Sequence, residues 1–324
     1  APAATIAAMS TRAAVTSTVG RVQEAGEELA VPGTKMPIRD CVVRVHKQVG
    51  AHAIPALAGN IAYRMMFAFF PTLISILWLL NVVGASQLVS QVSDLVGTVI
   101  PGVANSPLKE QLQEAPKPQA SGDFTLGVGV SLVVALWAIA ETFRATMHAL
   151  NVVYGVKERR SGLRRLLLSV LVSVVTMSLF VVALVVIVSG AGLTSAMADW
   201  SGLGVSYQWI WWSMAWAVVV GAVLAAFSLT YYFAPDVEQR VRWVGKGSLT
   251  GVGLWLLFTA IFALYVNVLS RPGETYGALA GIAFFMVYLY SSAFILLLGA
   301  EFNQVIENWE PEGKSTGERE PRDN

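Results

Sequence analysis

The sequence predicts an all-α membrane protein whose chain crosses the bilayer several times. Hydrophobic residues make up 55% of its 324 positions and charged residues only 13%, a balance outside the range of soluble globular domains. The mean hydropathy is +0.59. The apolar residues are grouped into runs of helix length, which polar or basic stretches separate. Because the hydrocarbon core offers no water to unpaired backbone groups, helices are the expected spanning elements.

Six apolar runs are long enough to span the hydrocarbon, which takes about 20 helical residues. Together they predict a transmembrane domain over residues 55–306. We expect the six helices at about 55–83, 124–150, 166–189, 209–233, 248–269 and 276–300.

The first of these helices contains a proline. Pro71 follows two phenylalanines inside the run, and a proline within a helix removes one backbone hydrogen bond and clashes with the preceding turn. We therefore expect a kink or break that acts as a hinge. Arg64 lies on the cytoplasmic side of this position.

Less apolar segments flank and interrupt the predicted domain. Residues 1–36 predict a flexible cytoplasmic tail without a signal peptide, and 307–324 an acidic cytoplasmic tail. Apolar residues recur at helical spacing over 37–54, which predicts an interfacial amphipathic helix. A similar stripe over 88–99, after the first spanning segment, predicts a second surface helix.

The basic residues predict the orientation of the chain, because Lys and Arg concentrate in cytoplasmic loops. Seventeen of them lie in the two terminal segments and in the second and fourth loops, whereas only three lie in the other loops. Both termini are therefore expected in the cytoplasm. The seventeen are Arg12, Arg21, Lys35, Arg39, Arg44, Lys47, Lys157, Arg159, Arg160, Arg164, Arg165, Arg240, Arg242, Lys246, Lys314, Arg319 and Arg322, and the three are Lys109, Lys117 and Arg271.

Polar residues cluster at one level of the predicted bundle. Glu141, Arg144, His148 and Asn151 are spaced by three, four and three residues, which places them along one side of the second helix. Counting helical rise at about 1.5 Å per residue puts these groups near the cytoplasmic boundary. Arg64, Asp236 and Glu301, from three other predicted helices, fall at a similar depth.

Two interpretations of this group of polar residues remain open. In the first, the helices leave the membrane here, and the charged side chains pair or reach the headgroup region. In the second, they line a cytoplasm-facing polar vestibule in which Arg64 and Arg144 bind an anionic group. Glu141 or Glu301 would then balance the charge of the arginines.

Other sequence features are given structural explanations. Gly277 and Gly281 form a small-xxx-small pair suited to helix packing. The basic run 157–165 is typical of a cytoplasmic loop that faces anionic lipid, so we expect no nucleic-acid partner. One cysteine, Cys41, and three scattered histidines predict no metal centre. Without a phosphate-binding glycine loop, no nucleotide cofactor is expected.

Several segments together resemble the YihY/BrkB family of bacterial inner-membrane proteins, and within it the YhjD-like branch. The family is similar in having six predicted helices with cytoplasmic termini, which implies a bacterial inner-membrane location. Where the family has a leucine, this chain has Ala234. The matching segments are 57–64 (LAGNIAYR), 70–71 (FP), 141–144 (ETFR), 151–156 (NVVYGV), 234–236 (APD), 275–281 (TYGALAG) and 299–303 (GAEFN).

The resemblance implies envelope integrity and lipid transport as the functional context. Members were once labelled ribonuclease BN, but the acidic residues here do not form the converging carboxylate cluster that a two-metal nuclease needs. We therefore expect no catalytic residues and no enzyme activity. The leading hypothesis is a transporter or flippase for an anionic lipid, with candidate ligand-binding residues Arg64, Glu141, Arg144, Asn151, Asp236 and Glu301.

The second hypothesis is a scaffold or envelope assembly factor that transports nothing. Its partner surface would be the stripe 88–99, and its partner a second copy of the chain or another envelope protein. A ribonuclease is the third.

Overall fold

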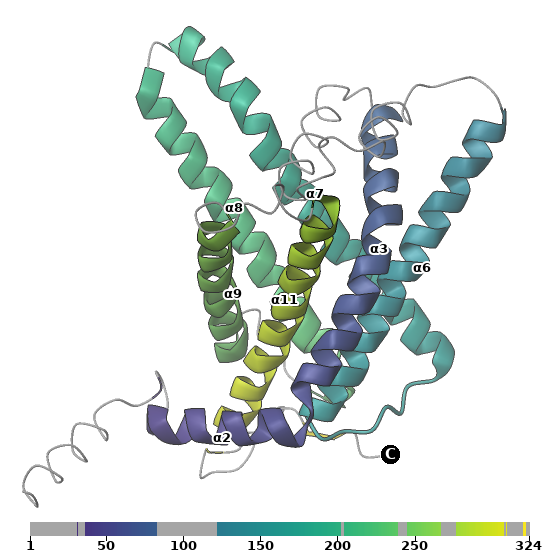
Figure 1. Ribbon diagram of the computed structural model, residues 1–324, viewed down its shortest axis with the longest axis vertical. Helices are drawn as coiled ribbons and strands as arrows, with labels where there is room; N and C mark the ends of the chain where they lie inside the picture. Colours follow the sequence, from purple (N-terminus) through teal and green to yellow (C-terminus); the bar gives the residue numbers. More distant parts are fainter. Residues whose placement is uncertain are drawn as a thin grey trace, which may run out of the picture.

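The computed structural model describes residues 31, 36–82, 122–201, 204–238, 245–266, 277–307, 309 and 320–321. In this part of the chain there are seven α-helices and one pair of two-residue strands, so the all-α class is confirmed (Figure 1). The helices are α2 (Ile38–Ala51), α3 (Ile54–Val82), α6 (Gly122–Val153), α7 (Gly162–Ser201), α8 (Gly204–Phe233), α9 (Lys246–Leu264) and α11 (Gly277–Glu307). The strands β1 (Val237–Glu238) and β2 (Glu320–Pro321) pair antiparallel.

Three predicted segments lie wholly or partly outside these residues. Of the tail 1–36 only residues 31 and 36 are described, and the stripe 88–99 is not described at all. The acidic tail 307–324 is described at 307, 309 and 320–321. The proposed division of the chain into domain and tails therefore stays a prediction.

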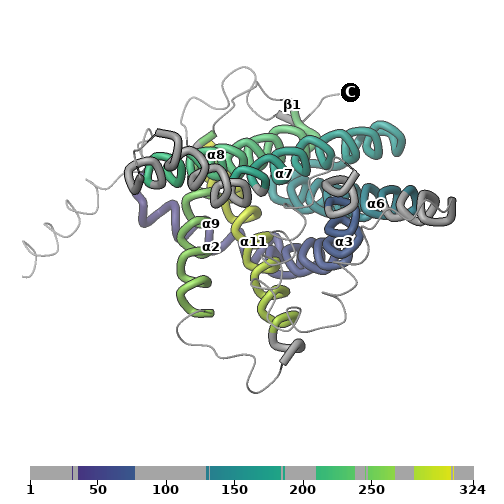
Figure 2. The backbone as a smooth tube through the Cα atoms, turned by 90° about the horizontal axis from the view of Figure 1, so that it is seen from above, coloured from purple at the N-terminus to yellow at the C-terminus, as the bar shows by residue number. Residues whose placement is uncertain are grey.

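The six long helices form a ring. In the order α3, α6, α7, α8, α9 and α11, each helix contacts the next, and α11 closes the ring against α3. Seen from above, α6, α7 and α8 form one row, and α3, α11 and α9 form a second row beside it (Figure 2). The short helix α2 lies across one end of the long helices (Figure 1).

Five of the helices in the described part of the chain are long and apolar enough to cross a membrane. Helix α6 lies where the second span is predicted but is not among the five, and Glu141 and Arg144 lower the hydropathy of its described part. Several helices able to span a membrane are thus confirmed, whereas the count of six and the cytoplasmic termini stay predictions. The five spans are Ile54–Ile76, Gly162–Ala183, Trp209–Phe233, Gly247–Leu264 and Gly281–Glu307.

Helix α3 continues through Pro71 without a break. The residues on both sides of this proline are helical, and the Ser75 hydroxyl donates a hydrogen bond of 2.8 Å to the Pro71 carbonyl. Proline has no N–H to donate to the carbonyl four residues earlier. The predicted break is therefore absent, and the kink and its role as a hinge stay predictions.

The amphipathic helix α2 buries its apolar face against the end of α11. Cys41 and Val45 are buried in a cluster with Val305 and Ile306, whereas Val42 is 59% exposed. Burial raises the pKa of the Cys41 thiol, because a desolvated thiolate is unfavourable. This packing holds α2 across the end of the bundle.

Helices α9 and α11 approach closely at glycines that the sequence argument did not single out. A Cβ atom on Gly247 would lie 2.7 Å from the Gly299 carbonyl oxygen, and one on Gly299 would lie 2.5 Å from the Tyr231 hydroxyl. Of the pair that was predicted to pack, Gly281 is buried in α11 and Gly277 is the first residue of that helix. The packing role of that pair stays a prediction.

Replacing Gly247 with Ala is expected to destabilise the protein by about 1–3 kcal/mol, as overpacking of a tight contact does. The added methyl group meets backbone, which cannot rotate away. Gly253→Ala is the matched control in the same helix, since nothing lies within 4 Å of the place that its methyl group would occupy and Ala favours helix by up to about 1 kcal/mol. Thermal unfolding in detergent should separate the two variants, and equal melting temperatures would contradict the close contact.

Candidate functional site

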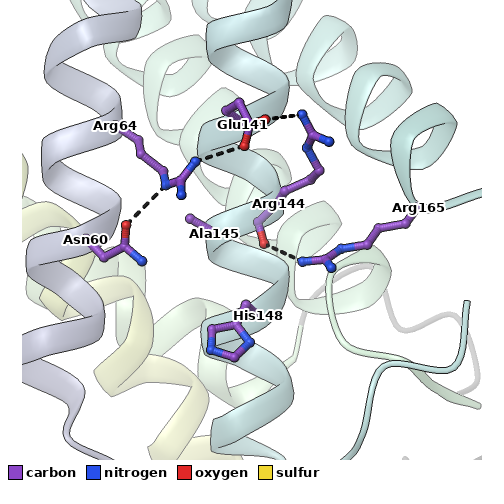
Figure 3. Close-up of a pocket in the computed structure, with 7 residues that line it drawn as sticks. All are labelled: Asn60, Arg64, Glu141, Arg144, Ala145, His148 and Arg165. Carbon is purple, nitrogen blue, oxygen red and sulfur yellow. Dashed lines mark hydrogen bonds and ion pairs between the residues drawn. The ribbon is translucent and has the colours of Figure 1, made fainter. Parts of the chain in front are cut away.

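A polar pocket lies between α3, α6 and the start of α7. It is open to the outside and has a volume of about 380 Å³. Helix α3 contributes side chains from its first half, α6 from its second half, and α7 from its first turn, so three helices meet at this point. The lining residues are Asn60, Arg64, Glu141, Arg144, Ala145, His148 and Arg165 (Figure 3).

One carboxylate bridges two arginines in the pocket. Glu141 Oε2 accepts a bond of 2.8 Å from Arg64 Nη1, and Glu141 Oε1 accepts one from Arg144 Nη2. The two guanidinium groups approach this carboxylate from opposite sides (Figure 3). Arg64 Nε also donates to Asn60 Oδ1 over 3.1 Å. Helices α3 and α6 are thus tied together by an ion pair at the pocket wall.

The pocket holds more hydrogen-bond donors than the protein uses. Three arginines line it against one glutamate. The Nε atoms of Arg144 and Arg165 are buried and have no hydrogen-bond partner, although Arg165 Nε lies 3.9 Å from the Glu158 carboxylate. Arg165 Nη2 donates to the Arg144 carbonyl over 3.2 Å. The two Nε atoms are closed off from solvent, but three guanidinium groups against one carboxylate leave an excess of positive charge in the lining, which favours an anion.

Exposed aromatic side chains border the pocket. Tyr63 and Phe67 on α3 are 58% and 61% exposed, and their ring centroids are 4.8 Å apart. Trp137 on α6 is 59% exposed, and the Arg144 guanidinium lies 5.2 Å from its ring centroid. Phe67 lies one turn after Arg64, and Trp137 lies one turn before Glu141. Phe67 and Trp137 therefore lie on the side of the pocket that is nearer the middle of their helices.

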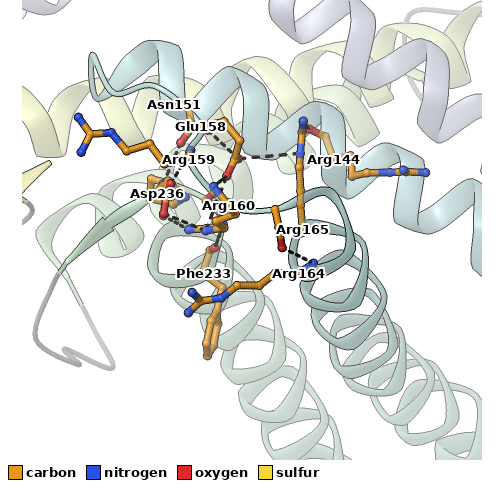
Figure 4. Close-up of polar contacts among 12 residues, drawn as sticks. Arg144, Asn151, Glu158, Arg159, Arg160, Arg164, Arg165, Phe233 and Asp236 are labelled. Carbon is orange, nitrogen blue, oxygen red and sulfur yellow. Dashed lines mark hydrogen bonds and ion pairs between the residues drawn. The ribbon is translucent and has the colours of Figure 1, made fainter. Parts of the chain in front are cut away.

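A second polar cluster, which we call the buried lock, joins the α6–α7 loop to the end of α8. Arg160 is 6% and Asp236 1% exposed at the side chain, and Arg160 Nε lies 3.0 Å from Asp236 Oδ1. Arg160 also donates to the carbonyl oxygens of Phe233, Ala234 and Pro235. Figure 4 shows Arg160 beside Asp236 and Phe233. The guanidinium therefore holds together the turn of the chain that follows α8.

Asn151 belongs to the buried lock and not to the pocket. Its Oδ1 accepts the Asp236 backbone N–H over 2.8 Å, and its Nδ2 donates to Glu158 Oε2 over 3.0 Å. Asp236 Oδ2 accepts the backbone N–H of Arg159. Both Asn151 and Asp236 were predicted to bind ligand beside Arg144. The structure differs, because their polar atoms are buried and bonded to other parts of the chain.

Glu301 also lies apart from the arginines of the pocket. Its side chain is fully buried, and Oε1 lies 2.5 Å from Nδ1 of His52 at the end of α2. The prediction paired Glu301 with Arg64 and Arg144 because all three lie at a similar depth. Equal depth does not specify which side of a helix a residue occupies, and Glu301 faces α2.

Of the six predicted binding residues, the structure brings together Arg64, Glu141 and Arg144. Sequence reasoning missed Asn60, which lies four residues before Arg64 on the same face of α3 and could have been found from that spacing. It also missed Arg165 as a pocket residue, because the basic run 157–165 was interpreted as a cytoplasmic loop that faces anionic lipid. His148, which the sequence places on the same stripe as Glu141 and Arg144, lines the pocket as well.

Metal-binding groups were sought in the same part of the chain. Among the described residues, no group of three or more His, Cys, Asp or Glu side chains is placed to hold a metal ion. The expectation that the protein is not an enzyme stays a prediction.

Comparison with known proteins places the chain in a family. Residues 45–323 match the family described as Virulence factor BrkB. "Putative ribonuclease-like protein YfkH" of Bacillus subtilis is 25% identical over 79% of this chain and 90% of its own length. "UPF0761 membrane protein azo3165" of Azoarcus sp. is 27% identical over 82% of this chain, which spans only 62% of that relative. "UPF0761 membrane protein IL2447" of Idiomarina loihiensis is 29% identical over 64% of this chain and 70% of its own length.

No solved structure gives a significant match. The family match extends over most of the chain and includes all seven described helices except the start of α2. The resemblance noted in the sequence is therefore confirmed. This chain is a membrane protein that belongs to the BrkB family.

Proposed function

We propose that this protein binds the anionic headgroup of a membrane lipid in the pocket between α3, α6 and α7, and moves that lipid across the bacterial inner membrane in support of envelope integrity. The observation that carries the proposal is the surplus of arginine charge. Three arginines line the pocket against one glutamate, so the lining carries more positive than negative charge.

The chemistry of these donors favours a phosphate group. A guanidinium presents its N–H groups as a planar fork that matches the oxygens of phosphate or carboxylate. Arg64, Arg144 and Arg165 come from three different helices, so a group with several anionic oxygens could bond to all three. A neutral or zwitterionic headgroup would leave part of this charge uncompensated.

A lipid is favoured over a soluble anion because the pocket adjoins apolar surface. Tyr63, Phe67 and Trp137 are all more than half exposed. The first two lie on α3, which contains one of the five candidate membrane spans in the described part of the chain. An acyl chain could lie along these rings while its phosphate occupies the pocket. The pocket is at the end of the bundle where the basic α6–α7 loop lies, which supports entry from the cytoplasmic side.

The first test measures lipid retention by native mass spectrometry. The protein is purified gently, incubated with equal amounts of phosphatidylglycerol and phosphatidylethanolamine, and compared with the double variant Arg144→Gln/Arg165→Gln. A charge-assisted hydrogen bond contributes about 1.5–3 kcal/mol, so the double variant should bind phosphatidylglycerol at least roughly tenfold more weakly. Retention of the zwitterionic lipid should change little.

Arg164→Gln is the matched control. It removes the same charge from the adjacent position, but Arg164 is exposed and does not line the pocket. If the double variant keeps its preference for phosphatidylglycerol, or if Arg164→Gln loses it equally, the pocket is not the binding site. Transport is then measured separately, as movement of labelled phosphatidylglycerol between the leaflets of reconstituted liposomes.

A further inference from the structure

The most deeply buried carboxylate in a candidate span of the described structure lies outside the lipid pocket. Glu301 is in the span Gly281–Glu307, and its side chain has no exposed area. Oε1 contacts His52 Nδ1, whereas Oε2 is buried without any hydrogen-bond partner. Ionisable residues in membrane segments are costly and commonly serve in ion or proton pathways. The lipid pocket makes no use of this pair.

The surroundings of Glu301 favour its neutral form. An ionised carboxylate with one unpartnered buried oxygen pays a large desolvation cost, and a bound proton removes that charge. Two further buried side-chain oxygens without partners lie on the same helices, Gln48 Oε1 on α2 and Gln304 Oε1 on α11. These oxygens lack hydrogen-bond donors, and a proton bound to Glu301 would supply one.

The groups that face this segment of α11 include one titratable partner. His52 of α2 contacts Glu301 directly, whereas Arg44, His46 and Lys47 on α2 have exposed side chains. Two tyrosine hydroxyls also lie against this segment. Tyr154 accepts a hydrogen bond of 3.4 Å from Asn303 Nδ2, and Tyr231 donates one of 2.6 Å to the Leu296 carbonyl. The other residues packed around the segment are buried and apolar or uncharged. They are Ile54 and Ala58 of α3, Met147 and Leu150 of α6, and Gly247 and Ser248 of α9.

His52 connects the buried carboxylate with water. Its side chain is 24% exposed, and it caps the C-terminus of α2. The next residue, Ala53, has a positive φ of 50°, and α3 begins immediately afterwards at Ile54. The pair therefore lies at the elbow from which α3 carries Asn60 and Arg64 into the lipid pocket.

We propose that Glu301 and His52 form a proton-binding site, in which Glu301 takes up a proton from water through the imidazole ring of His52. One proton enters the ring at Nε2 and another leaves from Nδ1 to Glu301 Oε1, so the ring keeps its charge and the carboxylate becomes neutral. Release follows the reverse path. The proton site itself does not depend on the proposed function. Only the further step, in which this proton drives lipid movement, rests on that function.

Infrared difference spectroscopy of the purified protein tests this site. A protonated carboxyl group has a C=O stretch separate from the carboxylate bands. The wild-type protein should show this band at low pH and lose it as the pH rises. The band should be absent from Glu301→Gln and kept in Glu307→Gln, which removes a carboxylate from the same helix end.

The variant His52→Gln tests the path to water and keeps the Glu301 carboxyl group. In heavy water, the shift of the Glu301 band on deuteration should be at least several-fold slower than in the wild type. An unchanged band in Glu301→Gln overturns the proton site, and unchanged deuteration in His52→Gln overturns the role of His52. Loss of lipid binding in the arginine variants with this band intact would contradict only the proposed function or its coupling, so the two failures are distinguishable.

Discussion

Replacing Asp236 with Ala is expected to destabilise the protein by about 3–5 kcal/mol, the cost of leaving one charge of a buried ion pair without its partner. Asp236 and Arg160 are 1% and 6% exposed at the side chain. The variant also removes the acceptor of the Arg159 backbone N–H. The contact between the α6–α7 loop and the end of α8 should therefore weaken. Thermal unfolding in detergent, followed by tryptophan fluorescence, measures the loss.

Two further variants make this prediction specific. Arg164→Gln removes an exposed charge from the same region and should change stability by less than about 0.5 kcal/mol. The double variant Asp236→Leu/Arg160→Met removes both buried charges but also leaves three backbone carbonyls without their Arg160 donors, so it should be no more stable than Asp236→Ala. If Asp236→Ala melts at the wild-type temperature, the ion pair does not hold this end of the bundle.

Replacing Glu141 with Gln is expected to strengthen the binding of phosphatidylglycerol by about fivefold. Glu141 occupies donors of both Arg64 and Arg144, so a headgroup that binds these arginines must compete with its carboxylate. The two ion pairs are partly exposed, and such pairs contribute about 0.2–1 kcal/mol each. Without the charge of Glu141 this competition ends, so the free energy of lipid binding should become more favourable by on the order of 1 kcal/mol. Native mass spectrometry of lipid mixtures measures the change.

The sign of this effect distinguishes two roles for Glu141. If its carboxylate mainly holds the arginines in position, Glu141→Gln should weaken binding instead. Asp40→Asn on α2 removes one exposed negative charge away from the pocket and controls for the net charge of the protein. A gain of equal size in that control would mean that charge alone, and not competition within the pocket, causes the effect.

Spacing along α6 and depth along α3 led the sequence analysis to group three of the seven residues that line the pocket. Arg64, Glu141 and Arg144 form its ion-paired wall. Residues three or four apart share a helix face, so Glu141 and Arg144 could be placed together from the chain alone. Arg64 was grouped with them because it lies at a similar depth. The structure brings it to them because α3 and α6 are neighbours in the ring.

The same reasoning failed for Asn151, Asp236 and Glu301. Depth along a helix gives one coordinate, whereas a contact also depends on how far each helix is rotated about its own axis. Asn151 lies on the stripe with Glu141 but near the end of α6, where the loop and the residues after α8 fold over it. Its partners Glu158 and Asp236 come from two other segments of the chain.

Composition and periodicity were enough to predict the class of the molecule. Long apolar helices, an amphipathic helix before them and basic loops can be predicted in this way, because burial in lipid and backbone hydrogen bonding act locally on each segment. The partners of the charged residues could be found only from the packed helices. Arg160 closes the buried lock, Glu301 meets His52, and Arg165 completes the pocket. Each of these pairings depends on the order and rotation of helices in the ring, which packing between distant segments determines.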